Sequence, residues 1–102
     1  MRILHLTTAG DWAHAQRSGS YTVSTRGRTL EQEGYIHCSQ PHQVEPVRKR
    51  FFDGVSDLML LEVETDLLTV PWRTEQLPGM TEAHPHVYGP IDLAAVVGVR
   101  PL

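Results

Sequence analysis

The chain has 102 residues, of which 40% are hydrophobic, and it carries a formal net charge of −3. This length allows one compact domain that buries about two-thirds of its unfolded surface, and it is too short for two domains. A slightly acidic chain does not favour a general nucleic-acid-binding protein, and its one local basic patch, Arg48-Lys49-Arg50 followed by Phe51 and Phe52, reads as the exposed and buried faces of a helix end. A single cysteine excludes an intrachain disulfide. We therefore expect one domain over residues 1–102, no nucleic-acid partner and a cytoplasmic location.

The hydrophobic residues are too scattered for a membrane segment. The first residues lack the apolar run of a signal peptide, and no stretch approaches the roughly 20 apolar residues of a membrane span. We expect no membrane association, and either a monomer or a weak homodimer.

Alternating side chains predict a first strand over residues 2–7. Thr8 and Asp11 have the spacing of a helix N-cap with an acidic third position, and Gly19 supplies a stop, so a short helix should follow. Residues 18–33 are polar with few apolar anchors. They predict a long loop that contains a brief strand or turn.

The next segment combines a short strand with a second helix. Residues 35–38 read as the strand, and Ser39 is placed to cap the helix. Pro46 lies too far along to be harmless in a helix that starts at this cap. We expect a kink at Pro46 or a helix that begins only near Glu45, with Gly54 ending it.

The second half of the chain is mostly strand. Residues 57–64 form a continuous apolar run, which is typical of a central strand covered on both faces. Residues 69–76 predict a strand interrupted by Pro71, and residues 96–99 predict a last apolar strand. The pattern predicts an α+β domain with five or six short strands and two helices.

Most of the reactive side chains fall in two segments, residues 34–39 and residues 84–90. Because alternate side chains of a strand share a face, His37 and Ser39 should project together, while Cys38 points the other way as a buried thiol. In the second segment the residues that share a face are His84, His86 and Tyr88. Two polar groups on one strand face cost about 1–3 kcal/mol each if unsatisfied, which favours a functional site.

A metal site is a competing interpretation of the same segments. His84 and His86 present two imidazoles on one face, and His37 or His42 would supply a third ligand. The sequence shows no carboxylate second shell for such a site, and Pro85 disturbs the spacing. We therefore expect no metal.

Four segments, residues 3–8, 34–39, 57–62 and 85–91, resemble the DUF952 family of small bacterial proteins in the same order. The resemblance spans nearly the whole chain. That family is of unknown function, and its fold is similar to the split β-sheet of ADP-ribosyltransferases. The resemblance implies a single α+β domain with a split mixed or antiparallel sheet and two helices. It also implies a cleft for a small-molecule nucleotide, with NAD as substrate or an ADP-ribosyl group as ligand.

The resemblance also implies residue roles. In ADP-ribosyltransferases a polar residue on the first strand holds the ribose, a second strand supplies a hydroxyl or aromatic group, and a later strand supplies a polar, often acidic, residue. The implied catalytic residues are His5, His37, His86 and Glu75, although Glu75 also suits a surface pair with Arg73. The implied ligand-binding residues are Ser39, Tyr88, Thr7, Tyr35 and Arg73. Three functions stay open: an enzyme that transfers ADP-ribose or cleaves NAD, a non-catalytic nucleotide-binding module, and a metal-dependent enzyme using His84 and His86.

Overall fold

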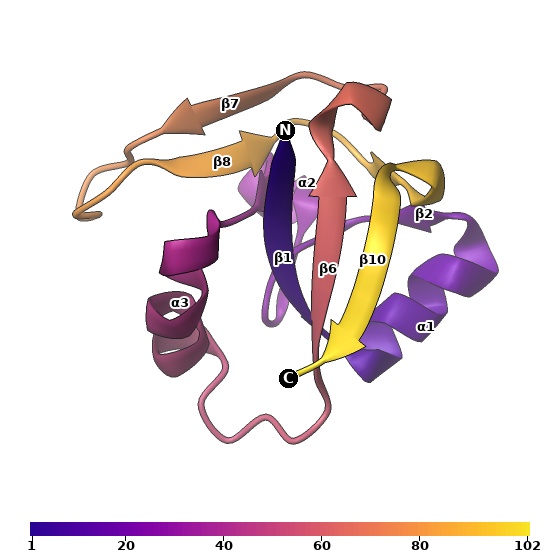
Figure 1. The fold of residues 1–102 in the computed structure, drawn as a ribbon, viewed down its shortest axis with the longest axis horizontal. Helices are drawn as coiled ribbons and strands as arrows, with labels where there is room; N and C mark the ends of the chain where they lie inside the picture. The colour runs from indigo at the N-terminus through magenta and orange to yellow at the C-terminus, as the bar shows by residue number, and fades with distance from the viewer.

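The computed structural model describes residues 1–102 as one α+β domain with two three-stranded antiparallel sheets and two short ribbons (Figure 1). The helices are α1 (Ala9–Ser18), α2 (Leu30–Glu33) and α3 (Val44–Phe51). The strands are β1 (Arg2–Thr8), β2 (Ser20–Tyr21), β3 (Val23–Thr25), β4 (Arg28–Thr29), β5 (Ile36–His37), β6 (Leu58–Glu64), β7 (Trp72–Glu75), β8 (His84–Val87), β9 (Ile91–Asp92) and β10 (Val96–Pro101). Single 3-10 turns occupy Pro41–Gln43, Thr65–Leu67 and Leu93–Ala95.

The first sheet has the order β1-β6-β10, with β6 in the centre. Leu61 and Val63 of β6 face a larger core that includes Ala15 of α1, while Leu58 and Leu60 face a smaller core built with α3. The continuous apolar run of β6 is therefore covered on both faces, which confirms the prediction of a central strand.

The second sheet has the order β5-β8-β7 and runs across one end of the first sheet (Figure 1). The backbones of Leu4 in β1 and Ser39 after β5 exchange two hydrogen bonds of 2.8 and 2.7 Å, and this isolated bridge connects the sheets. Ser39 was predicted to cap the second helix, but the segment instead turns through Gln40, whose N–H is bonded by the Gln43 side chain at 2.9 Å.

The two longer helices follow local sequence rules. Thr8 caps α1 by accepting a hydrogen bond from the Asp11 N–H at 3.1 Å, and Gly19 ends the helix with a φ of 89°. Helix α3 begins at Val44, so Pro46 falls in its first turn, where the missing N–H has no partner to lose. The prediction that this helix begins near Glu45 is confirmed.

The expected counts of two helices and of five or six strands were wrong, because the structure has three helices and ten strands. Residues 18–33 were expected to be a long loop with a brief strand or turn, and they contain the three short strands β2, β3 and β4 and the short helix α2. Thr29 and Gln32 form a reciprocal capping box that starts α2, with bonds of 2.9 and 3.1 Å. Strand β2 pairs with β9, which lies near the other end of the chain, and a local pattern cannot show this partner.

The strand pairs of all four sheets are antiparallel. None of the three helices has the length and apolar character needed to cross a membrane.

Candidate functional site

The β5-β8-β7 sheet collects imidazole side chains on one face, which we call the histidine face after His37, His84 and His86. His37 of β5 lies opposite His86 of β8, and Glu75 of β7 lies opposite His84. Directly opposed residues of an antiparallel pair share a face, and so do residues two apart in one strand. The register therefore brings His37, His86 and Glu75 together on one face.

The other face of this sheet points into the larger core. Ile36, Cys38 and Val87 are fully buried there. Burial raises the pKa of the Cys38 thiol well above its usual range, so the sulfur stays protonated and unreactive. The prediction that Cys38 points away from the histidines is confirmed.

His86 is oriented by a carboxylate. Its Nδ1 lies 2.9 Å from Oε1 of Glu75, and because a carboxylate accepts, this nitrogen carries the proton. The imidazole is 0% exposed and stacks under the Tyr35 ring, with ring centres 4.2 Å apart and planes inclined by 27°. Its Nε2 is buried and has no hydrogen-bond partner.

His37 and His84 form the rest of the histidine face. The ring centre of His37 lies 4.8 Å from that of His84 and 5.5 Å from that of His86. Burial first, and then the neighbouring histidines, lower the pKa of His37 to about 3, so its ring is neutral at neutral pH. Its Nε2 is also buried without a partner.

His84 is held by the backbone of the neighbouring strand. Its Nδ1 donates to the Cys38 carbonyl at 3.3 Å, and burial lowers the pKa of the imidazole.

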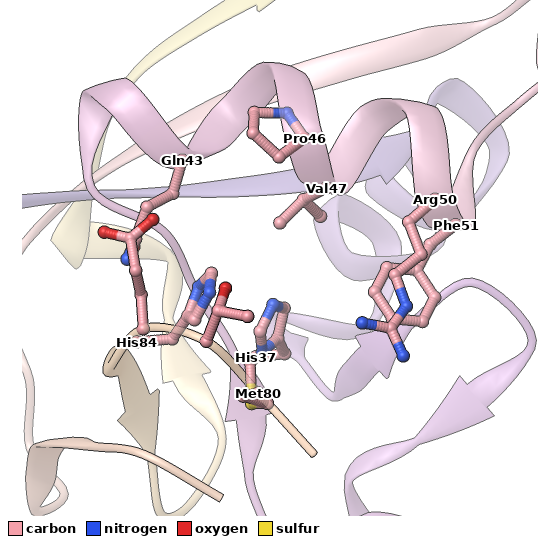
Figure 2. A pocket seen from close by; sticks show the side chains of 10 residues that line it. His37, Gln43, Pro46, Val47, Arg50, Phe51, Met80 and His84 are labelled. Carbon is pink, nitrogen blue, oxygen red and sulfur yellow. The ribbon is translucent and has the colours of Figure 1, made fainter.

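A cavity opens over His37 and His84 of this face, between α3 and the loop over residues 76–83, while His86 lies outside its lining. It has two lobes, of about 100 and 150 Å³, which share the side chains of His37, Arg50, Phe51 and Met80. Figure 2 shows the His37 and His84 rings side by side below α3, with Arg50 and Phe51 at one end. The first lobe is further lined by Gln43, Pro46, Val47, Thr81, Glu82 and His84, and the second by Thr25, Glu33 and Tyr35.

The loop over residues 76–83 is tied to the 3-10 turn before α3. The Gln43 side chain donates to the Ala83 carbonyl at 2.8 Å, and Nε2 of His42 lies 2.8 Å from Oε1 of Glu82. The hydrogen bond from His42 lowers the pKa of the Glu82 carboxyl. These contacts close one side of the cavity.

His5 and Thr7 lie in the core rather than in the cavity wall. Nδ1 of His5 donates to the His37 carbonyl at 2.6 Å, and Nε2 lies 2.6 Å from the hydroxyl of Tyr21. That hydroxyl is also 2.7 Å from Oγ1 of Thr7. Because both ring nitrogens of His5 are bonded within the protein, His5 supports the strand that carries His37 instead of facing a ligand.

The remaining predicted residues also lie outside the lining of the cavity, except Tyr35, which lines the second lobe. Ser39 is buried at the bridge between the sheets and does not line either lobe. Tyr88 lies beside Tyr35, with ring centres 5.9 Å apart, and the Arg73 guanidinium carbon sits 4.4 Å from the centre of the Tyr88 ring. Glu75 pairs with His86, so the alternative of a surface ion pair between Glu75 and Arg73 is not what the structure contains.

Arg50, Phe51 and Met80 line both lobes but were missed by the sequence analysis. Arg50 and Phe51 belong to a basic-aromatic run at the end of a helix, where an exposed and a buried helix face is the ordinary interpretation. In the structure the Phe51 side chain remains 37% exposed, whereas that of Phe52 is buried at 3%, so the two adjacent phenylalanines serve different roles. Met80 lies in a loop whose placement over His37 no local pattern shows.

No group of three or more His, Cys, Asp or Glu side chains is arranged to hold a metal ion.

Comparison with known proteins identifies the family but no activity. The family model described as "Protein of unknown function (DUF952)" matches residues 6–99. No curated protein matches the chain. A crystal structure of protein CC0527 from Caulobacter crescentus is 25% identical, with a TM-score of 0.85 over 100% of this chain and 86% of that one. The solution structure of CC0527 is 26% identical, with a TM-score of 0.80 over 99% and 84% of the two chains. The chain therefore belongs to the DUF952 family, as its sequence motifs indicated.

Proposed function

We propose that the histidine face and its cavity bind a nucleotide of the NAD or ADP-ribosyl class. The observation that carries this proposal is the buried Nε2 atom of His37, which lines both lobes and has no hydrogen-bond partner. An unpaired buried polar atom costs about 1–3 kcal/mol, and native proteins keep few of them. The same chain satisfies both nitrogens of the buried His5, whereas the Nε2 of His37 is left for a partner in the cavity.

The protonation of His37 limits the kind of partner. Its neutral ring carries one N–H and one lone pair, so Nε2 can meet either a donor or an acceptor of the ligand. Ribose hydroxyls and the nicotinamide carboxamide offer both.

The surroundings favour a ligand with a planar ring and a negative charge. Tyr35 and Phe51 line the second lobe with aromatic surface, and Arg50 supplies a cation there. Tyr88 and Arg73 extend the same combination along the sheet. A nucleotide combines hydroxyls, a planar ring and an anionic group, so it matches all three parts of the site.

The arrangement of the sheets supports NAD as the first nucleotide to test. The observation that supports this choice is the division of the fold into two three-stranded antiparallel sheets joined by a single bridge, because the resemblance to ADP-ribosyltransferases implies a split sheet. The structural relationship to ADP-ribosyltransferases is therefore part of the proposal.

Cleavage of the nicotinamide bond is the second candidate function, and the Glu75–His86 pair favours it. The Glu75 carboxylate is 27% exposed and is held by a fully buried imidazole, and it lies on the same sheet as the cavity-lining His37 without lining the lobes itself. When the bond from ribose C1′ to the nicotinamide nitrogen breaks, its electron pair leaves with neutral nicotinamide and the ribose becomes a cation. A fixed carboxylate stabilises that cation, and water or an acceptor hydroxyl then adds to C1′ and releases a proton.

Binding is tested by thermal unfolding and NMR titration with NAD and with ADP-ribose. Ligand at 100 times its dissociation constant should stabilise the fold by about 2.7 kcal/mol, and the His37 and His86 ring signals should shift. His37→Ala should weaken binding, while His14→Ala, at an exposed position of α1, should not. Millimolar ligand that changes neither the melting temperature nor these signals would show that the site binds something else.

Catalysis is tested separately by nicotinamide release. If NAD is cleaved, Glu75→Gln should abolish release while retaining ADP-ribose affinity, because the amide keeps the shape but not the charge. Binding without release in the unmodified protein would identify a non-catalytic module.

A further inference from the structure

Of the charged side chains that line the cavity, two carboxylates have salt-bridge partners and one cation has none. Glu33 accepts from Nε of Arg28 at 2.9 Å, and Glu82 accepts from His42 at 2.8 Å. Both carboxylates thus have partners outside the cavity. Arg50, the remaining charged residue of the lining, forms no salt bridge.

Arg50 is placed where it can meet a ligand. It lies in the last turn of α3 and lines both lobes, and its guanidinium carbon sits 5.2 Å from the centre of the Phe51 ring. In Figure 2 His37 lies between His84 on one side and Arg50 with Phe51 on the other. A cation stacked on an aromatic face keeps its N–H groups in the plane of the guanidinium, available to oxygens.

The second lobe adds hydroxyl donors to this cation. Thr25 and Tyr35 line it together with Arg50 and the unpartnered imidazole of His37. The guanidinium and the two hydroxyls together suit a group that offers several acceptor oxygens and a negative charge. A phosphoryl group has this chemistry, and a guanidinium matches its geometry with two parallel hydrogen bonds.

We propose that Arg50 is the phosphoryl-binding residue of the site, so that the second lobe takes the phosphate of a nucleotide. This inference rests on the proposed function and gives the ligand a direction: its phosphoryl end lies at Arg50, and its hydroxyl- or amide-bearing end lies toward His84. It also gives the site a preference for phosphorylated ligands over their nucleosides.

The test measures the affinities of ADP-ribose and of nicotinamide riboside, which has no phosphoryl group, by calorimetry. Arg50→Gln should weaken ADP-ribose about tenfold or more, as expected for the loss of a charge-assisted hydrogen bond, and leave the riboside within about twofold. Arg50→Lys should recover part of the loss, because a lysine keeps the charge but not the fork.

Lys49→Gln is the matched control. It removes the same charge from the neighbouring position of α3, but Lys49 faces away from the two lobes. If Lys49→Gln and Arg50→Gln weaken ADP-ribose binding equally, the effect of Arg50 comes only from its positive charge near the site, and the inference is overturned. Equal weakening of both ligands by Arg50→Gln would also overturn it.

Pyrophosphate separates this inference from the proposed function. If pyrophosphate shifts the NMR signals of Thr25 and Tyr35 in the unmodified protein but not in Arg50→Gln, while no nucleotide binds, the phosphoryl site stands and the nucleotide proposal fails. If NAD binds and Arg50→Gln leaves its affinity unchanged, the proposed function stands and the phosphoryl site fails. Absence of binding by pyrophosphate and by both nucleotides refutes both.

Discussion

Mild acid should destabilise this protein because His5 in the core and the half-buried His37 in the cavity wall are neutral. Burial lowers the pKa of His5 to about 4 and that of His37 to about 3, from an ordinary value of 6.5. In the unfolded chain both imidazoles return to the ordinary pKa. Between about pH 6.5 and pH 4 the unfolded state therefore binds more protons than the folded state, and the free energy of unfolding must fall as the pH falls.

The size of the effect follows from these pKa values. Each histidine costs about 1.4 kcal/mol per pH unit inside its window, so acidification to about pH 5 should remove about 2 kcal/mol for each residue and about 4 kcal/mol for the pair. His84, whose pKa is also lowered by burial, acts in the same direction. Because the total stability of small domains is about 5–15 kcal/mol, a loss of this size is easily measured.

Urea unfolding followed by tryptophan fluorescence, between about pH 7.5 and about pH 5, measures this loss above the range in which carboxylates titrate. His5→Gln and His37→Gln should each reduce the dependence on pH by about 2 kcal/mol over this interval. His14→Gln, at an exposed position, should leave it unchanged. A free energy of unfolding that is constant over this interval, or an undiminished dependence in both His5→Gln and His37→Gln, would refute the argument.

Three further substitutions test local contacts by the same unfolding measurement. Tyr21→Phe should cost about 1–3 kcal/mol, because it leaves Nε2 of the buried His5 without a partner. Gly89→Ala should cost about 1–3 kcal/mol, since its new Cβ would lie 2.6 Å from Cγ1 of Val70, a branched side chain that cannot rotate away. Thr8→Ala should cost about 1 kcal/mol by removing the N-cap of α1.

Gly10→Ala serves as the control for the glycine and cap variants. Gly10 lies inside α1, and a new Cβ there meets nothing nearer than 4.0 Å, so this change should stabilise the protein by about 0.5–1 kcal/mol. Unchanged stability in Tyr21→Phe would show that the hydroxyl is replaced by another donor. Unchanged stability in Gly89→Ala would show that the backbone can move away from Val70.

Predictions based on neighbouring residues were the successful part of the sequence analysis. The first strand, the cap and stop of α1 and the central strand depend on alternation, on a three-residue spacing and on one apolar run, all of which are local. Helix α2 also has a local signal, its capping box, which was overlooked in a polar stretch. Strand β2 has no such signal, because its partner β9 is far away in the chain.

The candidate site shows the same division. Alternation alone indicates that His84, His86 and Tyr88 share one face and that Cys38 lies opposite His37. Alternation cannot indicate what packs against each face. His5 has the same pattern as a ligand-facing histidine, yet the hydroxyl of Tyr21 and the His37 carbonyl satisfy both of its nitrogens.

The amino-acid order thus determined the strand faces and the short-range caps, because those depend on bond geometry and on residues a few positions apart. The folded chain decided which face became core and which became a cavity wall. That choice depends on α3 and on the loop over residues 76–83, which bring Arg50 and Met80 over His37. The positions of Arg50 and Met80 result from packing between segments that are distant in the chain, and a local sequence pattern carries no information about such packing.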